Sequence, residues 1–336
     1  MGKMITRIPL NLHSDWQKEL AQCVTDPIQL LQLLEIDPTP LSEDIKARRL
    51  FPMRVPRPFV QLMQKGNLQD PLLQQVFCSA SEFATAKGYS HDPLQEQDTP
   101  LPGLLHKYDT RVLIMLKGGC AINCRYCFRR HFPYQEHSLS ASQWQDILDY
   151  LHQRPQINEV IFSGGDPLMA KDEHLQRYIE ALAAIPHLKR IRIHTRLPVV
   201  LPQRLTPDLL SALTATRLKV VMVFHINHAN ELCSAFVENL QPFKNQILLL
   251  NQSVLLKGVN DSCDTLVALS EALYDANIQP YYLHMLDKVS GAQHFEVSLA
   301  QAQSLMQQIL TILPGFLVPK LVREQATKAS KTPIHF

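Results

Sequence analysis

Long apolar runs are absent from this 336-residue chain, and so is a secretory signal pattern. A helix that crosses a bilayer needs about 18 or more apolar residues in succession, and the best stretch, residues 247–256, is interrupted by Asn251, Gln252 and Ser253. Near the amino terminus, Lys3 and Arg7 are not followed by an apolar segment. We therefore expect a cytoplasmic protein that does not enter a membrane.

An excess of charge of one sign is also missing, because 33 Lys and Arg stand against 31 Asp and Glu. A net charge of +2 creates no overall field that would attract nucleic acid or an anionic membrane, so neither is an expected partner. Glycine is scarce, with 11 residues, and together with 23 prolines it falls short of a collagen-like or low-complexity composition. The 46% of hydrophobic residues predict a globular core.

Cysteine is infrequent but clustered, since three of seven lie within eight residues at Cys120, Cys124 and Cys127. This clustering favours a metal site in a reducing compartment over a set of disulfides. Three soft thiolates select zinc, copper(I) or an iron–sulfur cluster, and they leave one coordination position open. His131 could fill that position on a structural zinc ion, and unliganded thiols are a third interpretation.

The distribution of apolar residues predicts an α/β fold in three parts. Residues 1–106 have Pro-punctuated helical patterns, including a capping box at Ser14 and Gln17. Residues 107–325 alternate short apolar runs with amphipathic helices, and residues 326–336 form a polar tail. The predicted strands are 112–116, 159–162, 190–194, 219–224, 247–250 and 280–284, and the predicted helices are 140–152, 173–184, 207–216, 230–240, 264–276 and 299–313. Right-handed crossovers then predict a partial (β/α)6 TIM-like barrel with an N-terminal helical extension.

Polar segments follow most of the predicted strands, where parallel α/β sheets carry their sites. The cysteine loop itself is rich in cations, at Arg125, Arg129 and Arg130. On their own these arginines indicate a solvated basic face or an anion site. With zinc, the loop could instead belong to a nucleic-acid-binding or scaffold module.

The order of the motifs resembles the radical S-adenosylmethionine (SAM) superfamily and, over residues 107–333, the lysine 2,3-aminomutase family. The residues that carry the resemblance are the cysteine motif and Ser163-Gly164-Gly165-Asp166 after the second strand, with Lys-Tyr-Asp-Thr-Arg-Val-Leu (107–113), Cys-Arg-Tyr-Cys-Phe-Arg-Arg (124–130), Asn-Gln-Ser-Val-Leu-Leu (251–256) and Lys-Thr-Pro (331–333). The whole chain is most similar to the short family members that serve β-lysylation of translation elongation factor P.

The resemblance implies three cofactors. Cys120, Cys124 and Cys127 would hold one 4Fe-4S cluster per chain, and the open iron would bind SAM, which yields a 5′-deoxyadenosyl radical. The implied SAM contacts are Ser163, Gly164, Gly165, Asp166, His225 and Gln252. Lys331 would form the internal aldimine with pyridoxal 5′-phosphate (PLP), and Lys107 and Arg111 would hold its phosphate.

The resemblance also implies an isomerase that converts L-lysine to (R)-β-lysine. Arg129 would bind the substrate carboxylate, and Asp287 and Glu324 would bind the distant ammonium group, with Glu324 at a position where the family has aspartate. The implied partners are a reducing electron donor, elongation factor P and its β-lysine ligase, with a homo-oligomer left open. The alternatives are an aminomutase for another amino acid, or the zinc-bound module.

Overall fold

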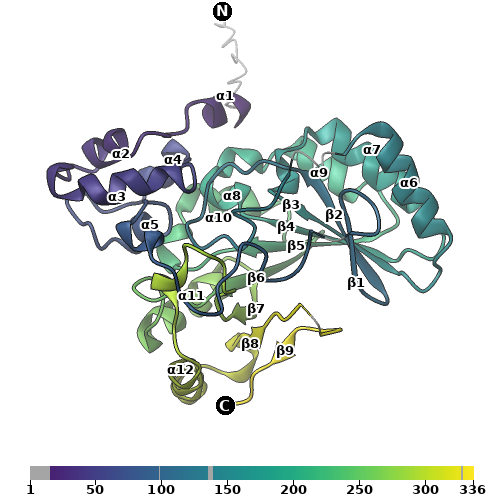
Figure 1. Ribbon diagram of the computed structural model, residues 1–336. Coiled ribbons are helices and arrows are strands. Elements are labelled where there is room, and N and C mark those ends of the chain that lie inside the picture. Colours follow the sequence, from purple (N-terminus) through teal and green to yellow (C-terminus); the bar gives the residue numbers. More distant parts are fainter. Residues whose placement is uncertain (1–15, 98, 135–138, 327) are drawn as a thin grey trace, which may run out of the picture.

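Short helices build the amino-terminal part of the protein. The computed structural model describes residues 16–97, 99–134, 139–326 and 328–336, so the capping residue Ser14 lies outside the described residues. Helix α2 begins with a typical helix-start sequence. The Asp26 side chain accepts a hydrogen bond from Gln29 N, and Pro27 occupies the first helical position. The α-helices of this part, which lie together at one end of the molecule (Figure 1), are α1 (Trp16–Ala21), α2 (Pro27–Leu33), α3 (Ser42–Lys46), α4 (Arg57–Val60) and α5 (Pro71–Gln74).

The centre of the molecule is one sheet whose strands follow their order in the sequence. Strands β2 to β8 pair in parallel, and β1 and β9 add antiparallel edges. All six predicted strands are confirmed. The strands are β1 (Leu104–Tyr108), β2 (Arg111–Lys117), β3 (Glu159–Gly164), β4 (Arg190–Thr195), β5 (Lys219–His225), β6 (Leu248–Val254), β7 (Gln279–His284), β8 (Lys320–Arg323) and β9 (Thr332–Pro333).

Helices follow the parallel strands and cover the outer face of the sheet (Figure 1). This arrangement confirms the partial TIM-like barrel with helices in front of it. The helices are α6 (Ala141–His152), α7 (Asp172–Ala183), α8 (Leu197–Val200), α9 (Pro207–Thr214), α10 (Ser234–Leu240), α11 (Cys263–Asp275) and α12 (Leu299–Ile312). Within the described segments, no helix has the length and apolar character that a bilayer crossing requires.

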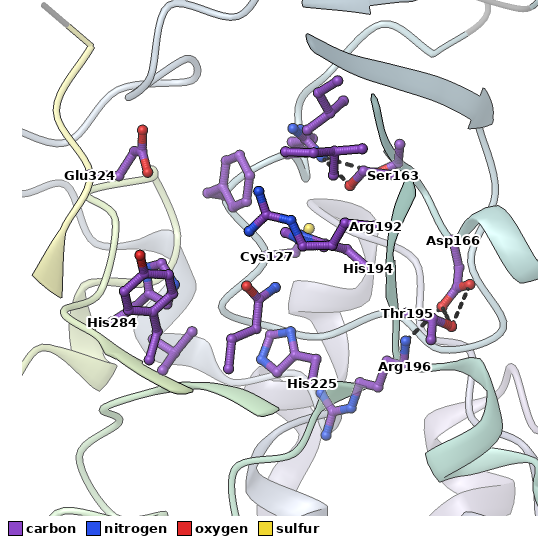
Figure 2. Close-up of a pocket in the computed structure, with 18 of the residues that line it drawn as sticks. Cys127, Ser163, Asp166, Arg192, His194, Thr195, Arg196, His225, His284 and Glu324 are labelled. Carbon is purple, nitrogen blue, oxygen red and sulfur yellow. Dashed lines mark hydrogen bonds between the residues drawn. The ribbon is translucent and has the colours of Figure 1, made fainter. Parts of the chain in front are cut away.

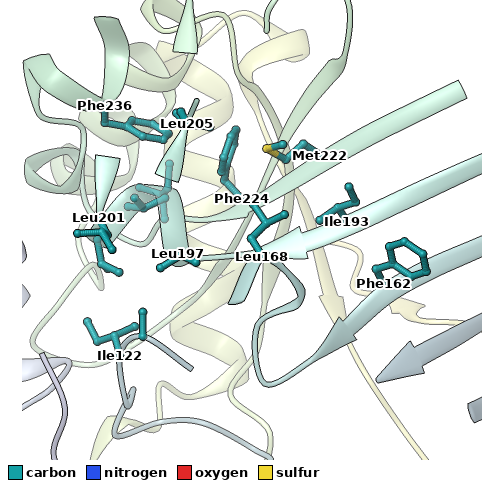
Figure 3. Packing of buried hydrophobic residues seen from close by; sticks show 14 of the residues in the cluster. Ile122, Phe162, Leu168, Ile193, Leu197, Leu201, Leu205, Met222, Phe224 and Phe236 are labelled. Carbon is teal, nitrogen blue, oxygen red and sulfur yellow. The ribbon is translucent and has the colours of Figure 1, made fainter. Parts of the chain in front are cut away.

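Successive side chains of the parallel strands point to opposite faces, as the pleat requires. Ile191 and Ile193 of β4 are completely buried, whereas Arg192 and His194 between and after them line a cavity. The apolar set packs under the helices (Figure 3), where Phe224 of β5 contacts Phe236 of α10 with ring centroids 5.3 Å apart. The barrel therefore has an apolar outer face, and its inner face carries the polar residues of the cavity among apolar ones such as Leu113, Ile161 and Val221.

The polar residues at the end of β6 correct the prediction that this strand stops at Leu250. The strand runs through Asn251 to Val254. Asn251 Nδ2 donates to Ile226 O at 3.0 Å and its Oδ1 accepts from Ile226 N at 3.0 Å, so the side chain extends the hydrogen bonding of the ladder. The short strand β9 lies within the segment predicted as a polar tail, and β8 lies just before it.

The division at residues 106/107 and 325/326 stays a prediction. Strand β1 spans the first of these positions, and β9 pairs with β8 across the second.

Candidate active site

One cavity of about 600 Å³ lies inside the barrel, and its lining runs along the strands, from Arg111 and Glu159 at their starts to Thr195 and His225 at their ends. This volume is in the range of small-molecule sites. The cavity brings together every residue that the sequence singled out for cofactor or substrate: Lys107, Arg111, Cys120, Cys124, Cys127, Arg129, Ser163, Gly164, Gly165, Asp166, His225, Gln252, Asp287, Glu324 and Lys331. Figure 2 shows part of this lining.

The cysteine loop after β2 is held in place by a buried ion cluster. Glu82 accepts from Arg125 Nε at 2.8 Å and from Arg130 Nη2 at 2.6 Å, and the Glu82 and Arg125 side chains are 0% exposed. Arg125 Nη1 also donates to Phe51 O at 2.7 Å. Two arginines that the sequence left as a basic patch therefore tie the loop to the amino-terminal helices.

Replacing Glu82 by glutamine is expected to lower the free energy of unfolding by about 3–5 kcal/mol, because two buried guanidinium groups lose their counter-charge. Urea titration followed by circular dichroism measures the loss. Glu43→Gln is the matched control, since Glu43 pairs with Lys46 at the surface, where both side chains are more than half exposed, and it should cost at most about 1 kcal/mol. Equal losses in both variants would contradict this account.

The three thiols line the same cavity and influence one another electrostatically. Burial, and then the charges of Cys127, Asp166 and Cys124, raise the pKa of Cys120 well above its usual value. Burial and Cys124 raise the pKa of Cys127 to about 11. Thiols that resist ionisation together become thiolates when a metal centre supplies positive charge. The donor set thus fits an iron–sulfur cluster that takes three cysteine ligands.

Arg196, just after β4, contacts the cysteine loop from the barrel side. Its Nη1 donates to Cys124 Sγ at 2.8 Å, and its Nη2 donates to Gln75 Oε1 at 2.7 Å and to Glu231 Oε2 at 2.9 Å. The sulfur and the carboxylate of Glu231 hold the pKa of Arg196 well above its usual value despite its burial. The permanently charged guanidinium of Arg196 therefore contacts Cys124, one of the three thiols.

The glycines after β3 allow a close approach of two backbone segments. A Cβ at Gly165 would lie 2.4 Å from Gly119 O, and Gly164 has φ +115°, where a Cβ would lie 2.7 Å from Lys117 O. Gly165 N donates to Lys117 O at 2.7 Å. These glycines therefore seat β3 against the start of the cysteine loop, and their contact with SAM stays a prediction.

Asp166 is buried and its carboxylate is occupied by the chain itself. It accepts from Thr195 Oγ1 at 2.8 Å and from the backbone N of Arg196, Leu197 and Leu168 at 2.8–3.0 Å. Burial raises its pKa, while these donors oppose the shift. Its position predicts a supporting role for the loop after β4; direct contact with SAM stays a prediction.

His225 and Gln252 are partners in the register of β5 and β6, so both side chains enter the cavity at the same height. The His225 Nε2 lies 3.3 Å from Tyr126 Oη. Burial and the Arg196 charge lower the pKa of His225 to about 3. The imidazole is therefore neutral at physiological pH and can donate or accept a hydrogen bond toward a ligand.

Lys331 and Lys107 share one carboxylate at the far side of the cavity. Glu324 accepts from Lys107 Nζ at 2.8 Å, from Tyr108 Oη at 2.7 Å and from Lys331 Nζ. Burial raises the pKa of Glu324, but the Lys331 charge and these donors outweigh it and bring the pKa to about 2. Arg111 lies with Cζ 4.0 Å from the centre of the Tyr108 ring. The predicted PLP lysine and the two predicted phosphate ligands thus meet at one place.

Arg129 and Asp287, the two substrate-binding groups that the sequence predicts, both line the cavity. Burial raises the pKa of Asp287 to about 7, with Lys331 and Arg129 opposing the shift. Arg129 is paired with Glu96, which no sequence pattern indicated. The sequence reasoning also missed His194, which lines the cavity with its buried Nε2 lacking a hydrogen-bond partner; its place at the end of an inward-facing strand was the available signal.

His131, the candidate fourth zinc ligand, is engaged elsewhere. Its Nε2 lies 3.2 Å from Ser290 O, and its ring stacks on His91 with centroids 4.1 Å apart. Among the residues described by the structure, no three His, Cys, Asp or Glu side chains are grouped as ligands of a single metal ion.

The comparisons with known proteins agree with this site. Residues 114–263 match the radical SAM superfamily. The chain is 52% identical to the L-lysine 2,3-aminomutase of Escherichia coli (strain K12), over 95% of this chain and 94% of that protein. It is 51% identical to the enzyme of that name in Haemophilus influenzae (95% and 95%) and 32% identical to that of Clostridium subterminale (96% and 78%). The chain belongs to the lysine 2,3-aminomutase family, whose members are isomerases of the radical SAM superfamily that use a 4Fe-4S cluster and SAM.

Proposed function

We propose that this protein converts L-lysine to (R)-β-lysine with a 4Fe-4S cluster, SAM and PLP. The observation that carries the proposal is one cavity whose lining includes both the three thiols and Lys331. The same lining carries a guanidinium and two carboxylates, the charges that an amino acid with a distant ammonium group requires.

The residues have distinct tasks in this reaction. Cys120, Cys124 and Cys127 hold the cluster, and Lys331 holds PLP, with Lys107 and Arg111 near enough to bind its phosphate. When bound, SAM on the reduced cluster would supply a radical that removes a hydrogen atom from C3 and returns it to C2, and PLP would supply an electron sink while nitrogen moves from C2 to C3.

Substrate selection depends on charge at both ends of the cavity. Arg129 receives the α-carboxylate, which suits a planar, always-charged fork. Asp287 receives the distant ammonium group and so favours lysine over an acidic amino acid. The Lys331 ammonium group occupies one carboxylate oxygen of Glu324. Glu324 can therefore help to bind the substrate's distant ammonium group once Lys331 has given up this contact. The buried walls exclude water from the reacting atoms.

The direct test uses anaerobically purified protein, reconstituted with iron and sulfide and supplied with dithionite, SAM, PLP and L-lysine. Chromatography should show β-lysine, and omission of any one cofactor should abolish it. Parallel assays with L-glutamate, L-arginine and L-ornithine examine the alternative of another substrate. Colourless protein with stoichiometric zinc and no product would contradict the proposal.

The acidity of Asp287 predicts a pH dependence. With a pKa of about 7, Asp287 is mostly protonated at pH 6 and cannot pair with an ammonium group. We expect kcat/KM for lysine to be about tenfold lower at pH 6 than at pH 8, since the ionised fraction rises by that factor. The same rise in pH removes the stability that protonated Asp287 contributes, fully present below about pH 4 and lost as the pH passes 7.

Asp287→Asn should remove this rise with pH while lowering kcat/KM at pH 8. Glu324 provides the contrast, because its pKa of about 2 leaves it ionised across the whole range. A profile that is flat between pH 6 and pH 8 in the unaltered protein would contradict the assignment of Asp287.

We propose further that the β-lysine serves a ligase that attaches it to a lysine of translation elongation factor P. The support is the resemblance of the whole chain to the short family members: it covers 94% and 95% of the E. coli and H. influenzae proteins but 78% of the C. subterminale protein. Deleting the gene should remove the β-lysyl mass from elongation factor P, and added β-lysine should restore it. The electron donor and a homo-oligomer stay predictions.

A further inference from the structure

A loop that contributes Leu94 and Glu96 to the cavity lining, residues 88–97, is fixed to the segment that carries Asp287. We call it the strap. Ser90 N donates to Lys288 O at 3.0 Å, and Ser290 N donates to Ser90 O at 2.9 Å. These bonds make an isolated bridge between Ser90 and Val289. The strap is thereby linked to the cavity wall at which the substrate's distant ammonium group is proposed to bind.

The last residues of the strap have an unusual conformation that directs Glu96 into the cavity. Gln95 has φ +52°, a left-handed conformation that is costly outside glycine. The Asp92 side chain compensates, because it accepts from Glu96 N at 3.0 Å and from Gln97 N at 3.2 Å. Strained backbone that is held in this way is typical of functional sites.

Glu96 meets Arg129 along one edge of the guanidinium. Arg129 Nε donates to Glu96 Oε2 at 2.6 Å, and Nη2 donates to Oε1 at 3.0 Å. The side chains are 8% and 18% exposed, so this two-point ion pair is shielded from water. The Phe128 ring lies 4.7 Å from Arg129 Cζ, and Arg129 Nη1 donates to Ser163 Oγ and Gly164 O at 3.3 Å.

A guanidinium has five N–H groups, and Glu96 uses two of them, on the Nε edge. The remaining N–H groups of Nη1 and Nη2 form the outer edge, where the described part of the chain makes two longer contacts, from Nη1 to Ser163 Oγ and to Gly164 O. A second carboxylate can therefore bind this outer edge while Glu96 keeps the first.

We propose that Glu96 is a positioning residue that fixes the Arg129 guanidinium so that its outer edge receives the substrate carboxylate. This inference rests on the proposed function of Arg129. Glu96 itself does not touch the substrate, and its negative charge opposes the incoming carboxylate. Its contribution is orientation, since the ion pair fixes the guanidinium plane before the substrate arrives.

The test compares Glu96→Gln, Glu96→Asp and the matched control Glu296→Gln. Glu296 binds Tyr89 Oη at 2.8 Å and Lys288 Nζ at 3.0 Å, at the outer side of the same junction, and does not line the cavity. In protein that carries cluster, SAM and PLP, equilibrium dialysis gives the Kd of labelled lysine, and the β-lysine assay gives KM and kcat. Visible absorbance gives the cluster and PLP content.

Glu96→Gln should raise Kd and KM for lysine about tenfold and change kcat less than about threefold, which is the signature of lost substrate binding. Glu96→Asp should recover part of the affinity, and Glu296→Gln should match the unaltered protein. Cluster and PLP content should be equal in all of them.

An unchanged Kd in Glu96→Gln would overturn the inference, and so would a lower Kd, which would make Glu96 a competitor of the substrate. Loss of cluster in both Glu96 variants would assign it a structural role instead. Failure of the proposed function has a different result: the unaltered protein would make no β-lysine, or Arg129→Lys would bind lysine as the unaltered protein does.

Discussion

Cys124→Ala protein is expected to lose the iron–sulfur cluster and β-lysine formation together. Two thiols cannot hold a cluster that needs three protein ligands, and Arg196, which donates to Cys124 Sγ at 2.8 Å, would be left as a buried cation with one partner fewer. Iron and sulfide content should fall to background, the visible absorbance should disappear, and chromatography should show no product.

Cys263→Ala makes the same change away from the cavity, at the first residue of α11, and should keep both cluster and activity. Circular dichroism shows whether the Cys124 variant still folds, because the helices around the barrel depend on the apolar outer face and not on the cluster. Cys124→Ala protein that assembles a complete cluster and isomerises lysine at the original rate would refute the proposed cofactor site.

Lys331→Ala is expected to abolish activity while leaving the cluster intact. The Lys331 amine lines the cavity and donates a hydrogen bond to Glu324. A primary amine of this kind is the group that binds PLP covalently. Borohydride reduction fixes the cofactor to its lysine, so peptide mass analysis of the unaltered protein should find the label on Lys331. The variant should show none there and no characteristic absorbance of bound PLP.

Lys328→Ala is the matched control, because Lys328 is exposed and lies three residues away. It should retain PLP and activity. A label on Lys328 or Lys107 in the unaltered protein, or β-lysine made by Lys331→Ala protein, would show that another lysine performs the task.

The strands of the barrel were predictable because their apolar residues are consecutive or alternate over four to seven positions. Strand β8 was missed because only Leu321 and Val322 are buried in it, and β9 because two residues carry no period. Both depend on pairing with a neighbour that the sequence does not reveal. The helix α2 was also missed, although Asp26-Pro27 is a readable start signal.

Motif residues could be predicted to share a site because parallel strands bring their carboxyl ends to one edge. Their partners could not be predicted. Glu82 and Glu96 lie 43 and 33 residues before the arginines they bind, in segments with no regular pattern. Nor did the sequence indicate that Lys107, Tyr108 and Lys331 meet on Glu324, a contact that requires β1 and β9 to flank the same cavity.

The outward-facing residues of the strands are apolar, whereas polar residues occur at many inward-facing positions, and this difference has an evolutionary consequence. Substitutions at inward positions such as Arg192, His194 or His284 alter the chemistry of the cavity while the residues under the helices stay unchanged. Selection can therefore retune the preferred amino acid with little loss of thermodynamic stability, so that paralogues with new specificities can arise on an inherited scaffold.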